Sequence, residues 1–192
     1  MNKIDALVMK KTFSAAEELQ RQGVLVPISF NVTCSDITNK TFIDSLQQLV
    51  DQQLVPANMI EIELTESQAM EDYKEVNPVL EKLLEMGVKV NIDDFGTGYS
   101  SLSYLHKFSL HTIKIDRSFI NQMERSEEHL TIVKTIAFMC SHLKLGVIAE
   151  GVESDEHIKI LKQLGILQAQ GYRFSKPVPA DEAQKLIVNF NA

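Results

Sequence analysis

Short apolar segments alternate with amphipathic segments along the chain, and this alternation predicts strands followed by helices. The segments typical of strands are residues 26–32, 59–64, 88–92, 112–115, 146–149 and 169–174. The segments typical of helices are residues 4–22, 42–53, 155–164 and 181–190, one that Gly87 closes and one that ends near Leu143. Because strands separated by helices pair in parallel, the sequence predicts an α/β fold with a parallel sheet.

A polar residue stands late in each of five successive strands: Asn31, Glu63, Asp93, Lys114 and Glu150. An open sheet gathers its ligand groups at one switch point, whereas a (β/α)8 barrel collects a residue from every strand at its carboxyl rim. The pattern therefore favours a TIM-like barrel. Only six strands are counted, and such barrels typically need about 250 residues. We therefore expect a barrel that is incomplete at the N-terminus, with about six of eight strands present.

Composition is typical of one soluble domain over residues 1–192, with 44% hydrophobic residues, 23% charged residues and a net charge of -7. The acidic balance argues against a nucleic-acid polymer as partner but leaves a nucleotide ligand open, because metal ions invert local charge. No apolar run approaches the roughly 20 residues of a membrane helix, and no signal peptide is recognised. Cys34 and Cys140 lack metal-ligand spacing, so we expect free thiols and a cytoplasmic location. The five histidines lack mutual spacing and are expected at the surface.

The acidic pair Asp93-Asp94, at the end of an apolar strand and before a glycine-rich turn, indicates a cation site. Oxygen ligands suit hard ions such as Mg²⁺ or Mn²⁺, and the candidates are Asn31, Glu63, Asp93, Asp94 and Glu150. Paired carboxylates permit two ions about 3.5–4 Å apart, the arrangement used for phosphoester hydrolysis.

Two further residues are candidates for chemistry at this rim. Lys114 would orient or deprotonate a water, or offset phosphate charge, and Gln170 would hold a water or a base edge. Each candidate also has a structural interpretation when it is taken alone. The aspartate pair or Glu150 could cap a following helix, and Lys114 could pair only with Asp116. The joint placement of these residues at one rim favours a functional site.

Five segments resemble the EAL family of cyclic-di-GMP phosphodiesterases in order and spacing. They are ELTES at 63–67, NIDDFGTGYSSLSYL at 91–105, TIKIDRSFI at 112–120, IAEGVES at 148–154 and QGYRFSKP at 170–177. The resemblance implies a modified barrel hydrolase of bacterial second-messenger signalling that uses Mg²⁺ or Mn²⁺ to convert cyclic di-GMP to linear pGpG.

The resemblance also implies residue roles. Glu153 is similar to a glutamate that anchors the loop from Phe95 to Leu102, which is implied to couple homodimerisation to metal binding. Lys114 resembles the residue that activates or orients the attacking water. Glu150 resembles a metal ligand that binds directly or through water. Gln170 resembles a polar residue of the site that binds substrate. An attached sensor or cyclase domain is a further implied partner.

The chain departs from the family in one respect, because it contains no Glu-Ala-Leu motif. That motif carries a metal-binding Glu on a first strand in the family. We therefore expect residues 1–192 alone to be inactive and poorly stable. The alternatives are a non-catalytic EAL-like module that binds cyclic di-GMP or a protein partner, and a different metal-dependent barrel enzyme.

Overall fold

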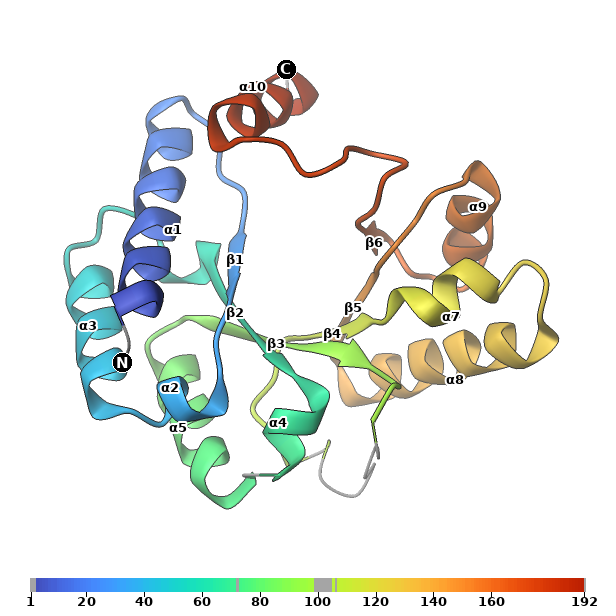
Figure 1. The fold of residues 1–192 in the computed structure, drawn as a ribbon, viewed down its shortest axis with the longest axis horizontal. Helices are drawn as coiled ribbons and strands as arrows, with labels where there is room; N and C mark the ends of the chain where they lie inside the picture. Colours follow the sequence, from blue (N-terminus) through green and yellow to red (C-terminus); the bar gives the residue numbers. More distant parts are fainter. Residues whose placement is uncertain (1–2, 72, 99–104, 106, 192) are drawn as a thin grey trace. The chain divides into compact units, whose positions relative to one another are not determined.

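The computed structural model describes residues 3–71, 73–98, 105 and 107–191, and the chain forms two compact units (Figure 1). The first unit comprises Met1–Leu64, Glu71–Val90 and Val178–Ala192, and the second comprises Thr65–Met70 and Asn91–Pro177.

The strands of the described chain follow one another in the sheet in the order β1-β2-β3-β4-β5-β6. The pairs β1–β2, β3–β4, β4–β5 and β5–β6 are parallel. The strands are β1 (Ile28–Asn31), β2 (Ile60–Thr65), β3 (Lys89–Phe95), β4 (Thr112–Ile115), β5 (Gly146–Ala149) and β6 (Gln168–Ala169).

The first unit is built on the apolar face of β2. Ile60, Ile62 and Leu64 alternate along this strand and are fully buried, as the period of two predicts. Within this unit α1 contacts β1, α3 and α10, while α2 contacts α3 and α5. Its helices are α1 (Lys3–Arg21), α2 (Cys34–Ile37), α3 (Lys40–Asp51), the 3-10 turn η1 (Ala57–Met59), α5 (Tyr73–Glu85) and α10 (Ala180–Asn191).

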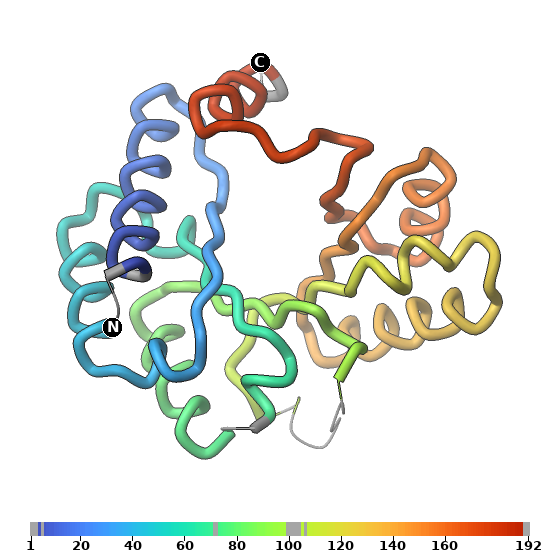
Figure 2. The backbone as a smooth tube through the Cα atoms, in the orientation of Figure 1, coloured from blue at the N-terminus to red at the C-terminus, as the bar shows by residue number. Residues whose placement is uncertain are grey.

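The second unit is built around β4, each of whose four residues is buried. Helix α8 contacts both β4 and β5, and it also packs beside α7. Figure 2 follows the backbone of this unit as it alternates between strand and helix from β4 to β6. Its helices are α4 (Glu66–Glu71), α7 (Arg117–Gln122), α8 (Glu127–Leu143) and α9 (Asp155–Gln163).

Side chains at the helix starts explain where the helices of the second unit begin. Asp116 accepts a hydrogen bond from the Ser118 N–H at the start of α7. Ser126 and Ser154 do the same for α8 and α9, each accepting from the N–H three residues later. These caps satisfy N–H groups that have no partner within the helix.

Several sequence expectations differ from the structure in detail. The single helix expected to end near Leu143 is two helices, α7 and α8, with a turn between them. The last strand ends at Ala169 rather than Phe174, because the chain turns there and the Phe174 N–H donates to the Gly171 carbonyl. The short helix α2 was not expected, although Thr33 caps it. His157 was expected at the surface but is only 5% exposed.

None of the helices in the described part of the chain is both long and apolar enough to cross a membrane.

Candidate metal-binding site

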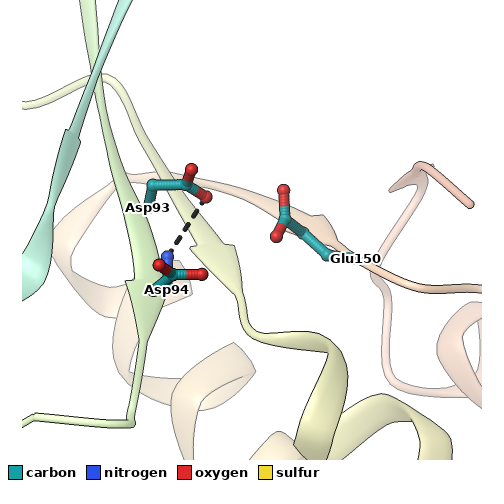
Figure 3. A group of neighbouring side chains, drawn as sticks. All are labelled: Asp93, Asp94 and Glu150. Carbon is teal, nitrogen blue, oxygen red and sulfur yellow. Dashed lines mark hydrogen bonds between the residues drawn. The ribbon is translucent and has the colours of Figure 1, made fainter. Parts of the chain in front are cut away.

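An irregularity in β3 brings the two aspartates of the pair to the same side of the strand. In a regular strand, neighbouring side chains point to opposite faces. The pairing of β3 with β4 shifts register between Ile92 and Phe95, and Asp94 has a left-handed φ of 54°. Such a conformation is uncommon outside glycine, although aspartate tolerates it better than most residues. The Asp94 N–H donates to Oδ1 of Asp93 at 3.1 Å (Figure 3).

Lys114 on β4 supplies the positive charge of this cluster. Its side chain is 4% exposed, and its Nζ lies 3.1 Å from Oδ1 of Asp93 and 2.6 Å from Oε1 of Glu150. The interpretation in which Lys114 pairs only with Asp116 is therefore wrong. Because the ammonium lies between two carboxylates, it offsets their mutual repulsion.

Glu150 follows β5 directly, and its backbone N–H donates to the Ile115 carbonyl, which continues the β4–β5 ladder by one residue. Oε1 of its carboxylate also accepts a hydrogen bond from Nε2 of Gln170 at 2.5 Å. Glu150 does not cap α9, because Ser154 does so. The structure therefore brings together Asp93, Asp94, Lys114, Glu150 and Gln170.

Figure 3 shows the carboxylates of Asp93 and Asp94 on one side of β3 and that of Glu150 facing them. One carboxylate oxygen from each of the three lies within 4.8 Å of the others. Partial burial and the charges of Asp93 and Asp116 raise the pKa of Asp94, whereas Lys114 and Arg117 act in the opposite direction. A cluster of oxygen donors with like charge fits a hard divalent cation, which would neutralise it.

Asn31 and Glu63 belong to the first unit, where they stand opposite each other in the parallel pair β1–β2. Glu63 is 6% exposed, and its carbonyl accepts from the Val32 N–H at 2.9 Å. Glu61, on the same face of β2, pairs with Lys89 at 3.5 Å.

Sequence reasoning missed a functional candidate in Glu66. Its side chain is buried, and Oε2 accepts a hydrogen bond from the Gly96 N–H at 2.8 Å, directly after the aspartate pair. Glu66 therefore holds the start of the loop for which Glu153 was the expected anchor. The backbone N–H of Glu153 donates to Nδ1 of His157, and residues 99–102 of the loop lie outside the described residues. A second acid three residues after Glu63 was the signal available in the sequence.

Gly96→Ala is expected to destabilise the chain by about 1–3 kcal/mol more than Gly165→Ala. Both glycines have positive φ, so both variants introduce backbone strain. A Cβ at Gly96 would lie 2.7 Å from the Phe119 ring, whereas a Cβ at Gly165 meets nothing within 4 Å. Urea unfolding of the two variants measures the difference, and equal losses would contradict the close packing of Phe119 on this loop.

A cleft of about 480 Å³ borders the carboxylate cluster within the second unit. Glu150 and Gln170 line it together with the cationic side chains of Arg117 and Lys176 and the ring of Tyr172. Tyr172 is 59% exposed, and Lys176 Nζ lies 5.7 Å from its ring centroid. The cleft thus combines a metal-ligand candidate, positive charge and an aromatic face.

Comparison with known proteins gives a match to the family model described as EAL domain over residues 1–177. The chain is 34% identical over 180 residues to the cyclic di-GMP phosphodiesterase NbdA of Pseudomonas aeruginosa, covering 93% of this chain and 23% of that protein. It is 34% identical over 159 residues to the cyclic di-GMP phosphodiesterase PdeR of Escherichia coli, covering 83% and 24%. The chain therefore spans about a quarter of the length of these relatives.

Several solved structures match this chain both in fold and in sequence. The EAL domain of Mycobacterium smegmatis DcpA matches with a TM-score of 0.90 at 30% identity, over 97% of this chain and 85% of that one. A complex of the PaMucR phosphodiesterase with c-di-GMP matches with a TM-score of 0.89 at 32% identity, over 94% and 74%. A manganese and cy-diGMP complex of Klebsiella pneumoniae BlrP1 matches at 0.78 and 29% identity, over 87% and 43%. The expected TIM-like α/β fold with six strands is confirmed.

Proposed function

Because the chain belongs to the EAL domain family, we propose that it binds cyclic di-GMP and hydrolyses it to linear pGpG with divalent metal ions. One observation carries this proposal: the carboxylates of Asp93, Asp94 and Glu150 converge beside a cleft whose cationic and aromatic residues suit a nucleotide. The cyclic di-GMP named for the relatives and bound in the similar structures fits that chemistry.

The proposed metal ligands are Asp93, Asp94 and Glu150, with Asn31 and Glu63 added on the strength of their motifs. Bound Mg²⁺ or Mn²⁺ would polarise a phosphate oxygen and lower the pKa of a water. The three clustered carboxylates supply the oxygen atoms that such ions prefer. A manganese complex of a similar domain supports this choice of ion.

Lys114 is proposed as the catalytic residue that orients the attacking water. Its Nζ lies between Asp93 and Glu150, so a buried ammonium, which can donate to the oxygen of a water, stands beside the carboxylates that would hold the ion. Gln170 holds the Glu150 carboxylate and also lines the cleft, where its amide would meet substrate. We propose Gln170 for both positioning and substrate binding.

The cleft is proposed as the binding place for part of the dinucleotide. Arg117 and Lys176 provide positive charge for phosphate oxygens, and Tyr172 offers an exposed ring on which a base can stack. Glu150 lies in both the cleft and the carboxylate cluster. A dinucleotide in the cleft would therefore reach the metal ligands with its phosphate.

The direct test is incubation of the purified chain, with and without an added Glu-Ala-Leu segment of the family, with cyclic di-GMP and Mg²⁺, followed by chromatography of the nucleotides. Formation of pGpG supports the proposal. Binding of cyclic di-GMP in calorimetry without pGpG would instead support the alternative, a non-catalytic module that responds to this nucleotide. If the chain neither binds nor hydrolyses cyclic di-GMP, both the hydrolase and the non-catalytic binding module are overturned.

We expect Mg²⁺ or Mn²⁺ to support hydrolysis and Ca²⁺ to suppress it. Ca²⁺ accepts a looser and higher coordination, with oxygen ligands about 2.3–2.6 Å away, whereas Mg²⁺ demands near-octahedral geometry at about 2.0–2.1 Å. Initial rates with each ion at matched concentration measure the effect. Equal rates in Ca²⁺ and Mg²⁺ would argue against a two-metal mechanism.

Two further parts of the proposal, a homodimer through the region of the 95–102 loop and an attached sensor or cyclase domain, rest on the family likeness alone. A single EAL-type barrel domain over residues 1–192 and a cytoplasmic location are also proposed, on the composition and the cysteines of the sequence. Sedimentation velocity of the purified chain tests the dimer.

A further inference from the structure

A buried histidine and two other polar residues tie down the connection between β5 and α9, which carries Glu150. Oε1 of Glu124, in the turn between α7 and α8, accepts a hydrogen bond from the Ser154 hydroxyl at 2.5 Å. The same oxygen lies 3.2 Å from Nε2 of His157. The His157 side chain is 7% exposed and that of Glu124 is 26% exposed, so the network is largely shielded from water.

The partners of His157 determine where its ring proton lies. The backbone N–H of Glu153 can only donate, and it points to Nδ1 of His157 at 3.3 Å. Nδ1 must therefore be the unprotonated acceptor, which leaves the proton on Nε2 for donation to Glu124. The ring thus joins the backbone at Glu153 to a carboxylate in the α7–α8 turn.

Other hydrogen bonds hold this connection toward β5 and β6. The Glu150 N–H donates to the Ile115 carbonyl, the Val152 N–H donates to the Gln170 carbonyl, and the Val152 carbonyl accepts from the Arg173 N–H. At the α9 end the Ser154 hydroxyl accepts from the His157 N–H, and the His157 ring and Glu124 secure the same end. Only three residues separate Glu150 from Ser154, so the α9 end lies close to Glu150 along the chain.

We propose that Glu124, Ser154 and His157 are positioning residues that fix the β5–α9 connection and, through it, the Glu150 carboxylate. The inference rests on the proposed metal-binding role of Glu150. Residues that orient metal ligands commonly matter for affinity although they do not touch the metal. The network would keep Glu150 in place against Lys114 and Gln170, ready for the ion.

Two substitutions at His157 separate its hydrogen bonds from its bulk. His157→Leu removes both the acceptor for Glu153 and the donor for Glu124. In His157→Gln the side-chain amide offers an oxygen that can accept and an N–H that can donate, so both bonds can form again. Glu124→Ala breaks the same tie at a more exposed position and keeps the test available if His157→Leu does not fold.

The chain offers a matched control in the serine that begins α8. Ser126 and Ser154 both accept from the N–H of the residue three positions later, which is a histidine in both cases. Ser154→Ala removes a helix cap and the bond to Glu124, whereas Ser126→Ala removes a cap at a different helix. The two variants should lose similar thermal stability, but only Ser154→Ala should affect the β5–α9 connection.

The experiment measures hydrogen exchange of the Glu153 amide and the affinity for Mn²⁺ by electron paramagnetic resonance. We expect His157→Leu and Glu124→Ala to accelerate exchange at Glu153 by at least about tenfold. We expect Mn²⁺ binding to weaken about tenfold, the lower end of the loss for groups that orient metal ligands. His157→Gln and Ser126→Ala should stay within about threefold of the unmodified chain in both measurements.

The outcomes distinguish this inference from the proposed function. If the unmodified chain does not bind Mn²⁺, the proposed metal site fails, and the positioning role fails with it. If the unmodified chain binds Mn²⁺ and His157→Leu and Glu124→Ala bind it equally well, only the positioning role is overturned. If Ser126→Ala and Ser154→Ala lose the same Mn²⁺ affinity, the loss is a general effect of helix capping, and the positioning role is also overturned.

Discussion

In a version of the chain extended by the family's Glu-Ala-Leu segment, Asp93→Asn and Asp94→Asn are each expected to lower the rate of cyclic di-GMP hydrolysis by about 10³-fold or more. The three carboxylates have oxygens within 4.8 Å of one another, so each of them would contribute charge and a ligand atom to the same ion. An amide keeps the shape of the side chain but removes the negative charge. The substitution should therefore weaken metal binding and, with it, the generation of the attacking hydroxide.

The measurement compares pGpG formation and Mn²⁺ affinity in the two variants with those in Asp51→Asn. Asp51 ends α3 and makes an exposed hydrogen bond with Gln47, so it provides the same chemical change in the first unit. Asp51→Asn should leave both quantities unchanged. More than a tenth of the original rate in either site variant would remove that aspartate from the proposed site.

In the same extended version, Lys114→Met is expected to lower kcat by about 10²–10⁴-fold and to change KM much less. A group that orients or deprotonates water acts mainly in the transition state, whereas a group that only grips phosphate acts on binding. Steady-state kinetics separate the two, because an increase in KM at unchanged kcat would assign Lys114 to phosphate binding instead.

The same variant has a second expected effect, on the metal-free chain. Lys114 is buried between Asp93 and Glu150, so its removal leaves two carboxylates without their cation. Breaking a buried ion pair from one side costs about 3–5 kcal/mol, and added Mg²⁺ should recover part of this loss by binding the folded state. Lys89→Met is the matched control, since Lys89 pairs with Glu61 in the first unit. Mg²⁺ should not rescue that variant, and equal rescue of both would contradict a metal-specific role for Lys114.

The elements that were predicted most accurately are two short strands. Thr112–Ile115 and Gly146–Ala149 occur with the expected limits. Each is a short run that contains β-branched residues and is followed directly by an acidic residue, so the local pattern indicates where it ends. The last strand was predicted too long because its limit depends on a turn at Gly171, which the apolar pattern does not encode.

Candidate site residues could be predicted because parallel strands deliver their last residues to one end of a sheet. This logic predicted that Asn31, Glu63, Asp93, Lys114 and Glu150 share one rim, and the second unit brings Asp93, Lys114 and Glu150 together. It did not identify Glu66, because the bond from Gly96 spans thirty residues. The lack of spacing among the histidines led to the prediction that His157 lies at the surface, whereas its side chain is buried and contacts Glu124 in a distant turn.

By itself, the sequence determined the order of strands and helices, the acidic oxygen chemistry of the site and the likeness to EAL domains, because these depend on local pattern and on motifs. Only the tertiary structure decided which side of β3 carries Asp94. Strict alternation would have placed Asp93 and Asp94 on opposite faces. The register shift against β4 and the left-handed backbone at Asp94 bring the two carboxylates together, and that geometry arises from the pairing of two strands.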